Sequence, residues 1–527
     1  MTLLGTLNSF LCEFLPGYQR ILRCPRQILG LSPFRGDIRP TRVALFEPGS
    51  RRPTVPFPHP WNYQKPIAIL ETFFWGADGE QGSGKHNRYL DVPGFAPILV
   101  TRDPGVIRAI TVTTGDKAGE FDRDTLPSTG IAQATGRDTL LFANGPAWKR
   151  QRKLSAGPFG KTTLFQPEQF HEFEATFRIT ISKRLEVLRN RLKTSNTSSV
   201  QVRLEPDISA IMLEMLANNF FGANIPADQI RDYFVPAMER VISHIVRSTV
   251  INRIGIPVKR LPGFTRQMAQ TKKDYAVFEE LTDLVLAPRT TNQGLWGRFK
   301  SDAPNEKLRS NIRVFLAGAL EATTSYASWA ISHLARNVAA QDKVFAEIQE
   351  IEDYNPVNLK ESDYFNWVMN ETLRLTPALY FLPRKATVDT LVETADGRKL
   401  WIPRGTHILL DIWHANRHED HWGVAKTGFS ATAFVPERWE AIKADKRRSA
   451  EMLHFGFGHG PRVCPGTHLG QLEVGLVVGA FVKIFRFQAT NPDNPPRAGV
   501  STKPLDGTLL ELQLRDDYVT ADHGDTE

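Results

Sequence analysis

The stretch that decides the fold is Phe457-Gly458-His459-Gly460-Pro461-Arg462-Val463-Cys464-Pro465-Gly466. Its glycines and prolines favour a tight loop, and a helical pattern of apolar residues begins directly after it, at Thr467. The chain of 527 residues has only three cysteines, Cys12, Cys24 and Cys464, which is too few for a disulfide framework. The sequence therefore predicts a thiolate held in a sheltered loop at the start of a helix.

Five positions of this loop carry the pattern: Phe457, Gly460, Arg462, Cys464 and Gly466. Given average residue usage, a chance match of all five in a chain of this length is on the order of one in ten thousand. Phe457 can shield the sulfur from water, while the two glycines let the backbone approach a macrocycle and aim amides at the thiolate. Arg462 suits a haem propionate, because guanidinium groups pair with carboxylates. A thiolate ligand on haem iron favours O–O cleavage. The alternative is that Cys464 is only a small buried hydrophobic residue.

In these residues the chain resembles the cytochrome P-450 family of haem-thiolate monooxygenases, and the resemblance covers roughly residues 85–490. It implies haem b as the cofactor, with Cys464 as the iron ligand and with Phe457 and Arg462 against the haem. It also implies a mainly α fold with a small β portion, built as a single haem domain. The predicted organisation is a lead-in over residues 1–66, the haem domain over residues 67–515 and a polar tail over residues 516–527.

The spacing of apolar residues predicts mostly helix. Helical periodicity dominates from Asp138 to about Asn355 and returns over residues 361–376 and 467–485. Short strands are predicted over residues 96–100, 399–402 and 407–410. Asp103-Pro104 predicts the start of a helix, because aspartate caps helices and proline fits their first position.

A second constellation is Glu371-Thr372-Leu373-Arg374, in which an acid and a base share one helix face. The same spacing occurs in Glu120…Arg123 and Glu186…Arg189, and most such pairs are ordinary surface ion pairs. In the family, however, this pair forms a buried network with an arginine from the stretch before the cysteine, which here is Arg438. The resemblance therefore makes Glu371, Arg374 and Arg438 structural residues on the cysteine side of the haem.

The stretch Trp148-Lys149-Arg150-Gln151-Arg152 resembles a further motif of the family, Trp-x-x-x-Arg. Trp148 and Arg152 lie one helical turn apart, so both can reach the same edge of the haem. With Arg384 and Arg462 they are the predicted partners of the haem propionates, which need pairing when they leave water. Taken without the cysteine loop, Trp148 and Arg152 equally fit a basic helix face in solvent.

The segment Ala317-Gly318-Ala319-Leu320-Glu321-Ala322-Thr323-Thr324 lies within a long apolar helical pattern. Its small residues leave room beside the helix, and Glu321 can relay protons from solvent. By resemblance the position after the acid is usually threonine, but here it is Ala322, and Thr323 comes about 100° further around the helix. We expect Glu321 to deliver protons, with Thr323 brought round by a local bulge or with a water. Alternatively, Thr323 bonds back to its own helix.

The net charge of +8 favours an anionic partner. A nucleic-acid role is not expected, because the sequence has no zinc-finger spacing and no basic low-complexity tail. By resemblance, two basic clusters lie on the cysteine face, where an acidic ferredoxin, a flavodoxin-like protein or a diflavin reductase would dock. Solvated surface charge is the alternative. The chain carries no reductase-like segment, so electrons are expected from a separate protein. The clusters are Lys149-Arg150-Arg152-Lys153 and Lys443-Lys446-Arg447-Arg448.

No run of 18 apolar residues occurs, so the sequence predicts no transmembrane segment. The few cysteines favour a reducing compartment, and we expect a soluble cytoplasmic protein. Residues 1–26 combine leucines and phenylalanines at helical spacing with several arginines. They predict either an amphipathic helix that contacts a membrane peripherally or a helix that packs on the protein.

The predicted function is a monooxygenase that inserts one oxygen atom from O₂ into a small apolar organic substrate, by hydroxylation or epoxidation. Ala322 keeps a first alternative open, a haem-thiolate enzyme that uses peroxide, or that isomerises or dehydrates an oxygenated substrate. The second alternative is a non-catalytic haem-binding or ligand-binding protein. Glu321 argues against it, because binding alone has no use for a proton relay.

Overall fold

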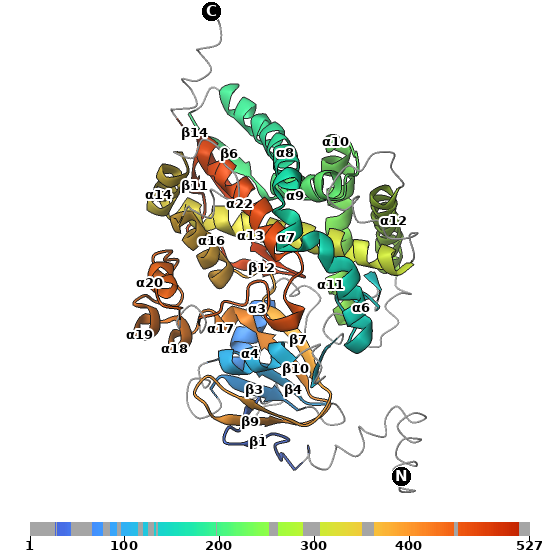
Figure 1. Cartoon of the computed structure of the whole chain (residues 1–527), viewed down its shortest axis with the longest axis vertical. Helices are drawn as coiled ribbons and strands as arrows, with labels where there is room; N and C mark the ends of the chain where they lie inside the picture. The colour runs from blue at the N-terminus through green and yellow to red at the C-terminus, as the bar shows by residue number, and fades with distance from the viewer. Residues whose placement is uncertain are drawn as a thin grey trace, which may run out of the picture.

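One long helix, α13 (Glu306–Arg336), runs through the middle of the protein and organises its helical part (Figure 1). It packs against α9 (Glu205–Glu214), α16 (Asp363–Leu375) and α22 (Thr467–Ile484). Apolar side chains such as Leu316 leave no surface in water, because neighbouring helices cover α13 on several sides. This burial supplies most of the stabilisation of such a helix.

The computed structural model describes the chain between residues 27 and 515. Within this span, it leaves out 28, 44–65, 77–84, 92–95, 114–119, 125–130, 133–134, 137, 196–197, 252–261, 288–305, 350–362 and 447–451. The N-terminal helix predicted over residues 1–26 and the tail over residues 516–527 therefore lie outside the described residues. Among the described helices, none combines the length and the apolar run that crossing a bilayer requires.

Helices dominate the described structure, as the sequence predicts. The longer helices besides α13 and its neighbours are α3 (Pro66–Phe74), α4 (Pro104–Thr113), α6 (Gly145–Ala156), α8 (Pro167–Lys193), α11 (Val235–Ile251), α12 (Pro262–Leu286), α14 (Val338–Gln349) and α20 (Arg438–Ala444). The shorter helical segments are η3 (Gly157–Phe159), α7 (Lys161–Leu164), η4 (Met215–Phe220), α10 (Ala227–Gln229), η5 (Ile230–Phe234), α17 (Ile412–Ala415), α18 (Glu419–Trp422), α19 (Val424–Thr427) and η8 (Gly460–Arg462).

The main sheet lies below the helices in Figure 1 and has the strand order β2-β3-β4-β10-β7-β5. In it β10 is parallel to β4 and antiparallel to β7. Smaller sheets have the orders β1-β9-β8, β11-β14-β6 and β12-β13. The strands are β1 (Arg35–Gly36), β2 (Thr41–Arg42), β3 (Asn87–Leu90), β4 (Ile98–Thr101), β5 (Phe121–Arg123), β6 (Val200–Arg203), β7 (Phe381–Ala386), β8 (Thr390–Glu393), β9 (Lys399–Ile402), β10 (His407–Asp411), β11 (Phe485–Ala489), β12 (Pro496–Ala498), β13 (Thr502–Pro504) and β14 (Leu509–Leu514).

The strands predicted over residues 399–402 and 407–410 are present as β9 and β10, and the one predicted over residues 96–100 is β4. The start of α4 is confirmed as well. Asp103 Oδ1 accepts the backbone N–H groups of Gly105, at 2.9 Å, and Val106, at 3.1 Å. The carboxylate thus satisfies two amides that a helix leaves unpaired at its first turn.

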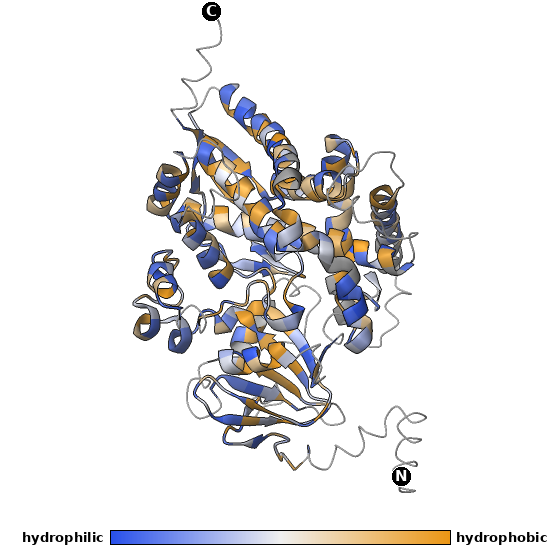
Figure 2. Cartoon of the chain, in the orientation of Figure 1, coloured by the Kyte–Doolittle hydropathy of each residue, from blue (hydrophilic) through white to orange (hydrophobic). Residues whose placement is uncertain are grey.

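The helix that follows the cysteine loop, α22, is apolar on nearly all faces. Hydrophobic residues predominate along α22 and α4 in Figure 2, whereas α6 is largely hydrophilic. A helix that is apolar all round must be covered on all sides, and α13, α14 and α8 cover α22. The cysteine loop is therefore attached to one of the most deeply buried helices of the protein.

Glu473 is a carboxyl group in the middle of this buried helix. It is 1% exposed, and its Oε1 has no hydrogen-bond partner among the described residues. Burial raises the pKa of Glu473 to about 8. The folded protein therefore keeps a proton that the unfolded chain releases above about pH 4.3. Because the folded-state pKa is the higher one, stability is lost as the pH rises toward 8.

This effect predicts the pH dependence of a Glu473→Gln variant. Between pH 5 and pH 7, the free energy of unfolding of the unmodified protein should fall by about 2 kcal/mol more than that of the variant, because glutamine does not titrate. Urea denaturation followed by tryptophan fluorescence measures both slopes. The control is Glu440→Gln, which changes an exposed carboxylate on α20. Parallel slopes for Glu473→Gln and the unmodified protein would show that Glu473 is ionised in the folded state.

Candidate active site

The loop that carries Cys464 is held in shape by its own backbone. The Cys464 N–H donates to the Phe457 carbonyl at 2.9 Å, and the Val463 N–H donates to the Gly460 carbonyl at 3.0 Å. The hydroxyl of Thr467, at the start of α22, donates to the Cys464 carbonyl at 2.8 Å. These bonds join the loop to the helix as one rigid unit, so the thiol has a fixed place in the fold.

Gly460 lies against the end of α4. Its backbone lies in the left-handed region, with φ at 70°, and a Cβ there would overlap the backbone of Thr111 and Val112 at the end of α4. Only glycine fits both constraints without strain. The close approach that requires Gly460 is thus to α4, which fixes the loop between this helix and α22.

The thiol of Cys464 lies deep in the protein, although its side chain remains accessible. Burial raises the pKa of the Cys464 thiol, and two groups oppose this effect: the N–H of Gly466, which bonds to the sulfur, and the charge of Arg152. Arg152 also donates from Nη1 to the Val463 carbonyl at 2.9 Å. A donor amide and a cation next to the sulfur stabilise a thiolate, and the thiolate is the form that binds metals.

Three arginines converge beside this loop. Arg384 on β7 stands opposite Arg123 on β5 in the sheet. Arg462 donates from Nη2 to the Asn144 side chain at 2.8 Å, and that side chain in turn bonds the backbone of Arg123. The guanidinium of Arg462 also lies 4.4 Å above the ring of Trp148. Trp148 and Arg462, which the sequence predicted as partners of one ligand, are therefore in contact.

Burial and the repulsion of neighbouring guanidinium groups disfavour the charged form of two of these arginines, Arg384 and Arg462. Burial, together with the other two arginines, holds the pKa of Arg384 well below its usual range. Burial, followed by the charges of Arg123 and Arg152, lowers the pKa of Arg462 to about 9, although Asp122 offsets part of the repulsion. Arg462 Nε and Nη1 and Arg123 Nε are buried without a hydrogen-bond partner among the described residues. Buried guanidinium groups with unused donors fit a ligand that carries carboxylates.

A second buried cluster has its own carboxylate. Glu371 on α16 accepts from Arg374 at 2.7 and 2.9 Å and from Arg438 on α20 at 2.9 Å. Trp439 and the backbone N–H of Val435 donate to the same carboxylate. Glu371, Arg374 and Arg438 are all 0% exposed. The structure brings together the three residues that the sequence predicted, and their remaining donors bond to carbonyls of the segment that precedes the cysteine loop.

Glu321 does not stand free on α13. Its Oε1 accepts from Lys503 at 2.9 Å and its Oε2 accepts from Ser501 at 2.7 Å. Burial by itself would raise the pKa of Glu321, but the charge and the hydrogen bonds of Lys503 and Ser501 outweigh it and hold this pKa below its ordinary value. The carboxylate is thus ionised and tied to β13 and its neighbouring turn.

Thr323 donates its hydroxyl to the Ala319 carbonyl at 2.5 Å, which is a bond back to its own helix. The helix α13 is regular through this segment, without the local bulge that would rotate Thr323 into the position of Ala322. Gly318 is exposed in the middle of the helix, a Cβ on it would meet no atom within 4 Å, and Ala322 lies one turn further on the same face. The small face of α13 therefore borders open space.

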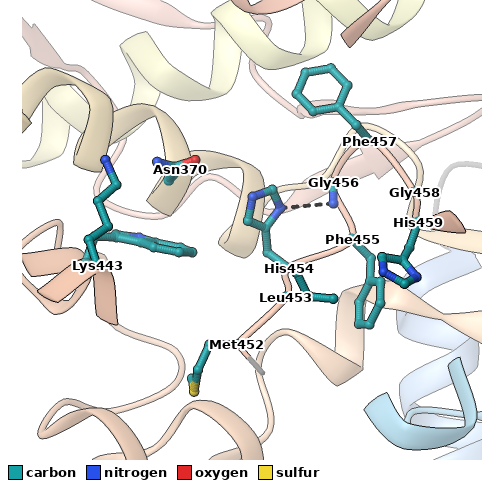
Figure 3. A pocket seen from close by; sticks show the side chains of 11 residues that line it. Asn370, Lys443, Met452, Leu453, His454, Phe455, Gly456, Phe457, Gly458 and His459 are labelled. Atoms are coloured by element: carbon teal, nitrogen blue, oxygen red, sulfur yellow. Dashed lines mark hydrogen bonds between the residues drawn. The ribbon is translucent and has the colours of Figure 1, made fainter. Parts of the chain in front are cut away.

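Phe457 joins the loop to α13. Its ring packs edge to face against the ring of Tyr326 on α13, with the two ring centres 6.2 Å apart. On its other side the loop borders a pocket of about 290 Å³, between the cysteine loop and α20. Figure 3 shows the ring of Phe457 turned away from this pocket, while Lys443, Asn370 and His454 surround it. The pocket is separate from the thiol, and it lies at the outer side of the loop.

A comparison with known proteins agrees with this geometry. The family model for cytochrome P450 matches residues 91–510. The chain belongs to the cytochrome P450 family. Members of this family carry haem with a cysteine thiolate ligand, and the family's enzymes are monooxygenases. The haem-thiolate cofactor and the enzyme class predicted from the sequence are thereby confirmed.

The relatives of this P450 are plant enzymes at low identity. The chain is 28% identical over 452 residues to (+)-vincadifformine 19-hydroxylase from Catharanthus roseus, which covers 78% of this chain and 82% of the relative. It is 25% identical over 441 residues to amorpha-4,11-diene 12-monooxygenase from Artemisia annua, which covers 79% and 80%. The match to geraniol 8-hydroxylase from Catharanthus roseus, at 28% identity, spans only about half of each chain.

The residues present fit a haem group. A haem carries two carboxylates, and Arg123 and Arg462, which lie beside Arg384, have unused buried donors for them. The accessible, cation-flanked thiol of Cys464 suits an iron ligand. The sequence analysis missed Arg123 and Lys503. The strand of Arg123 is only three residues long, and Lys503 becomes relevant only through its contact with Glu321, so neither left a signal in the sequence.

The arginine cluster predicts how firmly this P450 holds haem. Arg462→Met should release haem at least about tenfold faster, because a charge-assisted hydrogen bond contributes roughly 1.5–3 kcal/mol. Transfer of haem to an excess of apomyoglobin, followed by visible absorbance, measures this rate. The matched control is Arg486→Met, which removes a half-exposed arginine paired with Asp342 on the surface. If both variants release haem at the rate of the unmodified protein, Arg462 is no propionate partner.

The Glu371 cluster predicts a large loss of stability on a single substitution. Glu371→Ala leaves Arg374 and Arg438 buried without their carboxylate, which costs about 3–5 kcal/mol. Glu186→Ala is a matched control, because Glu186 and Arg189 have the same spacing on an exposed helix face, where such a pair contributes under about 1 kcal/mol. Denaturation midpoints compare the two variants. Equal losses would contradict the structural role of Glu371.

Proposed function

We propose that this P450 inserts one oxygen atom from O₂ into a C–H or C=C bond of a small apolar molecule, using electrons from a separate protein. The observation that carries the proposal is the thiol of Cys464, which lies deep in the protein, fixed in a rigid loop and flanked by Arg152. When bound, the haem supplies the oxygen-activating redox chemistry, and a thiolate ligand suits that chemistry. The protein's own contribution is to hold, orient and supply protons.

Cys464 is the proposed ligand of the haem iron, with the Gly466 amide and Arg152 offsetting part of the effect of burial, which raises the pKa of its thiol. Arg384 and Arg462 are the proposed partners of the propionates, and Arg123 joins them because it shares their cluster. Trp148 supports the Arg462 guanidinium from one side. Phe457 packs between the loop and α13 and excludes water from the cysteine side.

The small face of α13 is the proposed wall of the substrate site. Gly318 and Ala322 present little more than backbone there, which leaves room for dioxygen and an apolar ligand. Glu321 is the proposed carboxylate of a proton relay, which accepts and passes on protons together with Lys503 and Ser501, the two residues that hold it. Thr323 takes part only when its hydroxyl turns away from the Ala319 carbonyl, so water is the more accessible proton carrier in this geometry.

Electrons are proposed to come from an acidic protein that docks beside the cysteine loop. Lys149 and Arg150 are exposed on α6, the helix whose Arg152 bonds to the loop. Lys443 lines the pocket beside the same loop (Figure 3). Basic groups on α6 and α20 thus lie near the loop, and an acidic ferredoxin, flavodoxin-like protein or diflavin reductase would be attracted there. Arg447 and Arg448 lie outside the described residues.

One observation favours a second candidate function. No hydroxyl is presented at the position of Ala322 on the described α13, and Thr323 uses its own to bond Ala319. An enzyme that accepts peroxide, or that rearranges or dehydrates an oxygenated substrate, needs fewer protons delivered from that helix. We therefore propose it as the alternative to O₂-dependent monooxygenation.

Substitution of Ala322 separates the two candidates. Threonine and valine have the same shape, so Ala322→Thr and Ala322→Val differ only in the hydroxyl. With a diflavin reductase and NADPH, a monooxygenase should form product. The threonine variant should then lose less reducing power as peroxide than the valine variant, because its hydroxyl assists proton delivery. Product and hydrogen peroxide per NADPH are measured on a panel of apolar substrates, with added peroxide in place of the reductase in a parallel series.

Each outcome of this experiment has a clear consequence. Product formed with peroxide alone, and no difference between the two variants, would favour the second candidate. Ligands that shift the haem spectrum without any product would favour a non-catalytic binding protein. A Cys464→Ala variant is the first check. Its reduced, carbon-monoxide-bound form should lack the Soret band of a thiolate-ligated haem, and a retained band would overturn the assignment of Cys464.

A further inference from the structure

Three histidines, His86, His418 and His421, meet beside α18. His86 precedes β3. His418 caps the N-terminus of α18, and His421 lies within this short helix. The centre of the His86 ring lies 4.5 Å from the centre of the His418 ring and 4.7 Å from that of the His421 ring. One nitrogen of each ring lies within 4.8 Å of the other two. The side chains of His86 and His418 are only 11% and 14% exposed.

Two of these rings have nitrogens that nothing else uses. His86 Nε2 donates to Asp420 Oδ2 at 3.0 Å, which leaves the lone pair of the ring on Nδ1. His86 Nδ1 and His421 Nε2 are buried and have no hydrogen-bond partner among the described residues. Unsatisfied buried nitrogens are costly and uncommon, so two that face one cluster require a reason. Packing of three neutral rings against one another would bury these nitrogens without giving them a hydrogen-bond partner.

The pairing of His86 with Asp420 is the arrangement that orients a metal ligand. A metal-binding histidine usually donates its other ring nitrogen to a carboxylate, which fixes the tautomer and makes the ligand more basic. His418 uses Nδ1 to accept the exposed amide of Asp420 at 3.1 Å. His418 can give up this hydrogen bond and bind an ion through Nδ1, because a water molecule can then accept from the exposed N–H of Asp420.

The charges around the cluster are compatible with a cation. Burial, followed by the nearby Arg102, lowers the pKa of His86 to about 4, and burial lowers the pKa of His418 and of His421 to about 3. The rings are therefore neutral near neutral pH and keep their lone pairs. Arg102 and Lys85 add positive charge, and the ionised Asp420 beside His86 offsets part of it.

We propose that His86, His418 and His421 bind a zinc ion, with Asp420 orienting His86, and that this ion fastens β3 to α18. Imidazole nitrogens suit Zn²⁺, which prefers tetrahedral sites with Zn–N distances of about 2.0–2.1 Å. This requires nitrogen separations of about 3.3 Å, so the rings must close in from their present spacing of up to 4.8 Å. The short helix α18 can move with its two rings.

The place of the ion in the fold suggests its purpose. Trp422, the last residue of α18, gives its carbonyl to Arg438 at 3.0 Å. A zinc ion at the start of α18 would therefore brace the segment that holds Arg438 in the Glu371 cluster. The site is thus structural, and it stands whether or not the proposed oxygenation is correct.

Zinc binding to the haem-loaded protein tests the proposal. The protein is stripped with a chelator and titrated with ZnCl₂ in competition with a fluorescent zinc chelator, and bound zinc per chain is counted by mass spectrometry after gel filtration. We expect about one tightly bound zinc per chain. His86→Asn and His421→Asn should each weaken zinc binding at least about 100-fold, and Asp420→Asn about 10-fold to 100-fold. The control is His171→Ala, which removes an exposed histidine on α8 and should change nothing.

A second measurement does not depend on folded variants. X-ray absorption at the zinc edge, on the unmodified protein with one equivalent of zinc, should show a shell with three imidazole ligands and no sulfur. Saturating zinc should also raise the unfolding temperature of the unmodified protein but not of His421→Asn. Fewer than two imidazoles in the shell, sulfur ligation, or equal zinc affinity for the unmodified protein and both histidine variants would overturn the proposal.

Discussion

The structure around the active site depends on one carboxylate, Glu371, shared by two buried guanidinium groups. All three groups are fully removed from water, so none can be lost without leaving a buried charge unpaired. The remaining donors of Arg374 and Arg438 bond to backbone carbonyls between residues 416 and 433. A segment with little regular structure thereby acquires a fixed path, and the cysteine loop continues from it. The ion cluster thus fixes the backbone of this segment through hydrogen bonds, as the neighbouring strands of a sheet fix a β-strand.

A comparison of the two buried arginine clusters distinguishes a structural role from a ligand-binding one. Around Glu371 two guanidinium groups share one carboxylate, and their other donors bond to several carbonyls of the protein. Around Arg462 the arginines repel each other, Asp122 offsets only part of that repulsion, and buried donors remain unused. A buried arginine can therefore indicate a structural role or a ligand-binding role. The number of hydrogen-bond acceptors that the protein offers to its guanidinium group distinguishes the two.

On α13 the contacts of two side chains differ from what their sequence pattern alone suggests. Glu321 lies on the predicted helix, yet its carboxylate is neutralised by Lys503 and does not stand free. Thr323 satisfies its hydroxyl within one turn of helix, which costs nothing in packing. What α13 offers to the interior is a face of glycine and alanine. Any proton delivery along such a face would have to rely on groups outside the helix. Lys503 and Ser501 are candidates, because both bond to Glu321.

The sequence by itself determined the cysteine loop, the predominance of helix and local features such as the Asp103 cap, because all of these depend on residues within a few positions of one another. It also identified Glu371, Arg374 and Arg438, although only through resemblance to a family. Only the tertiary structure decided which distant groups meet. It places Gly460 against the end of α4, Arg123 opposite Arg384, Lys503 on Glu321 and His86 beside α18. Contacts of this kind leave no local pattern, since chain segments far apart in sequence come together only when the core forms, and their charges acquire meaning only once water has been excluded.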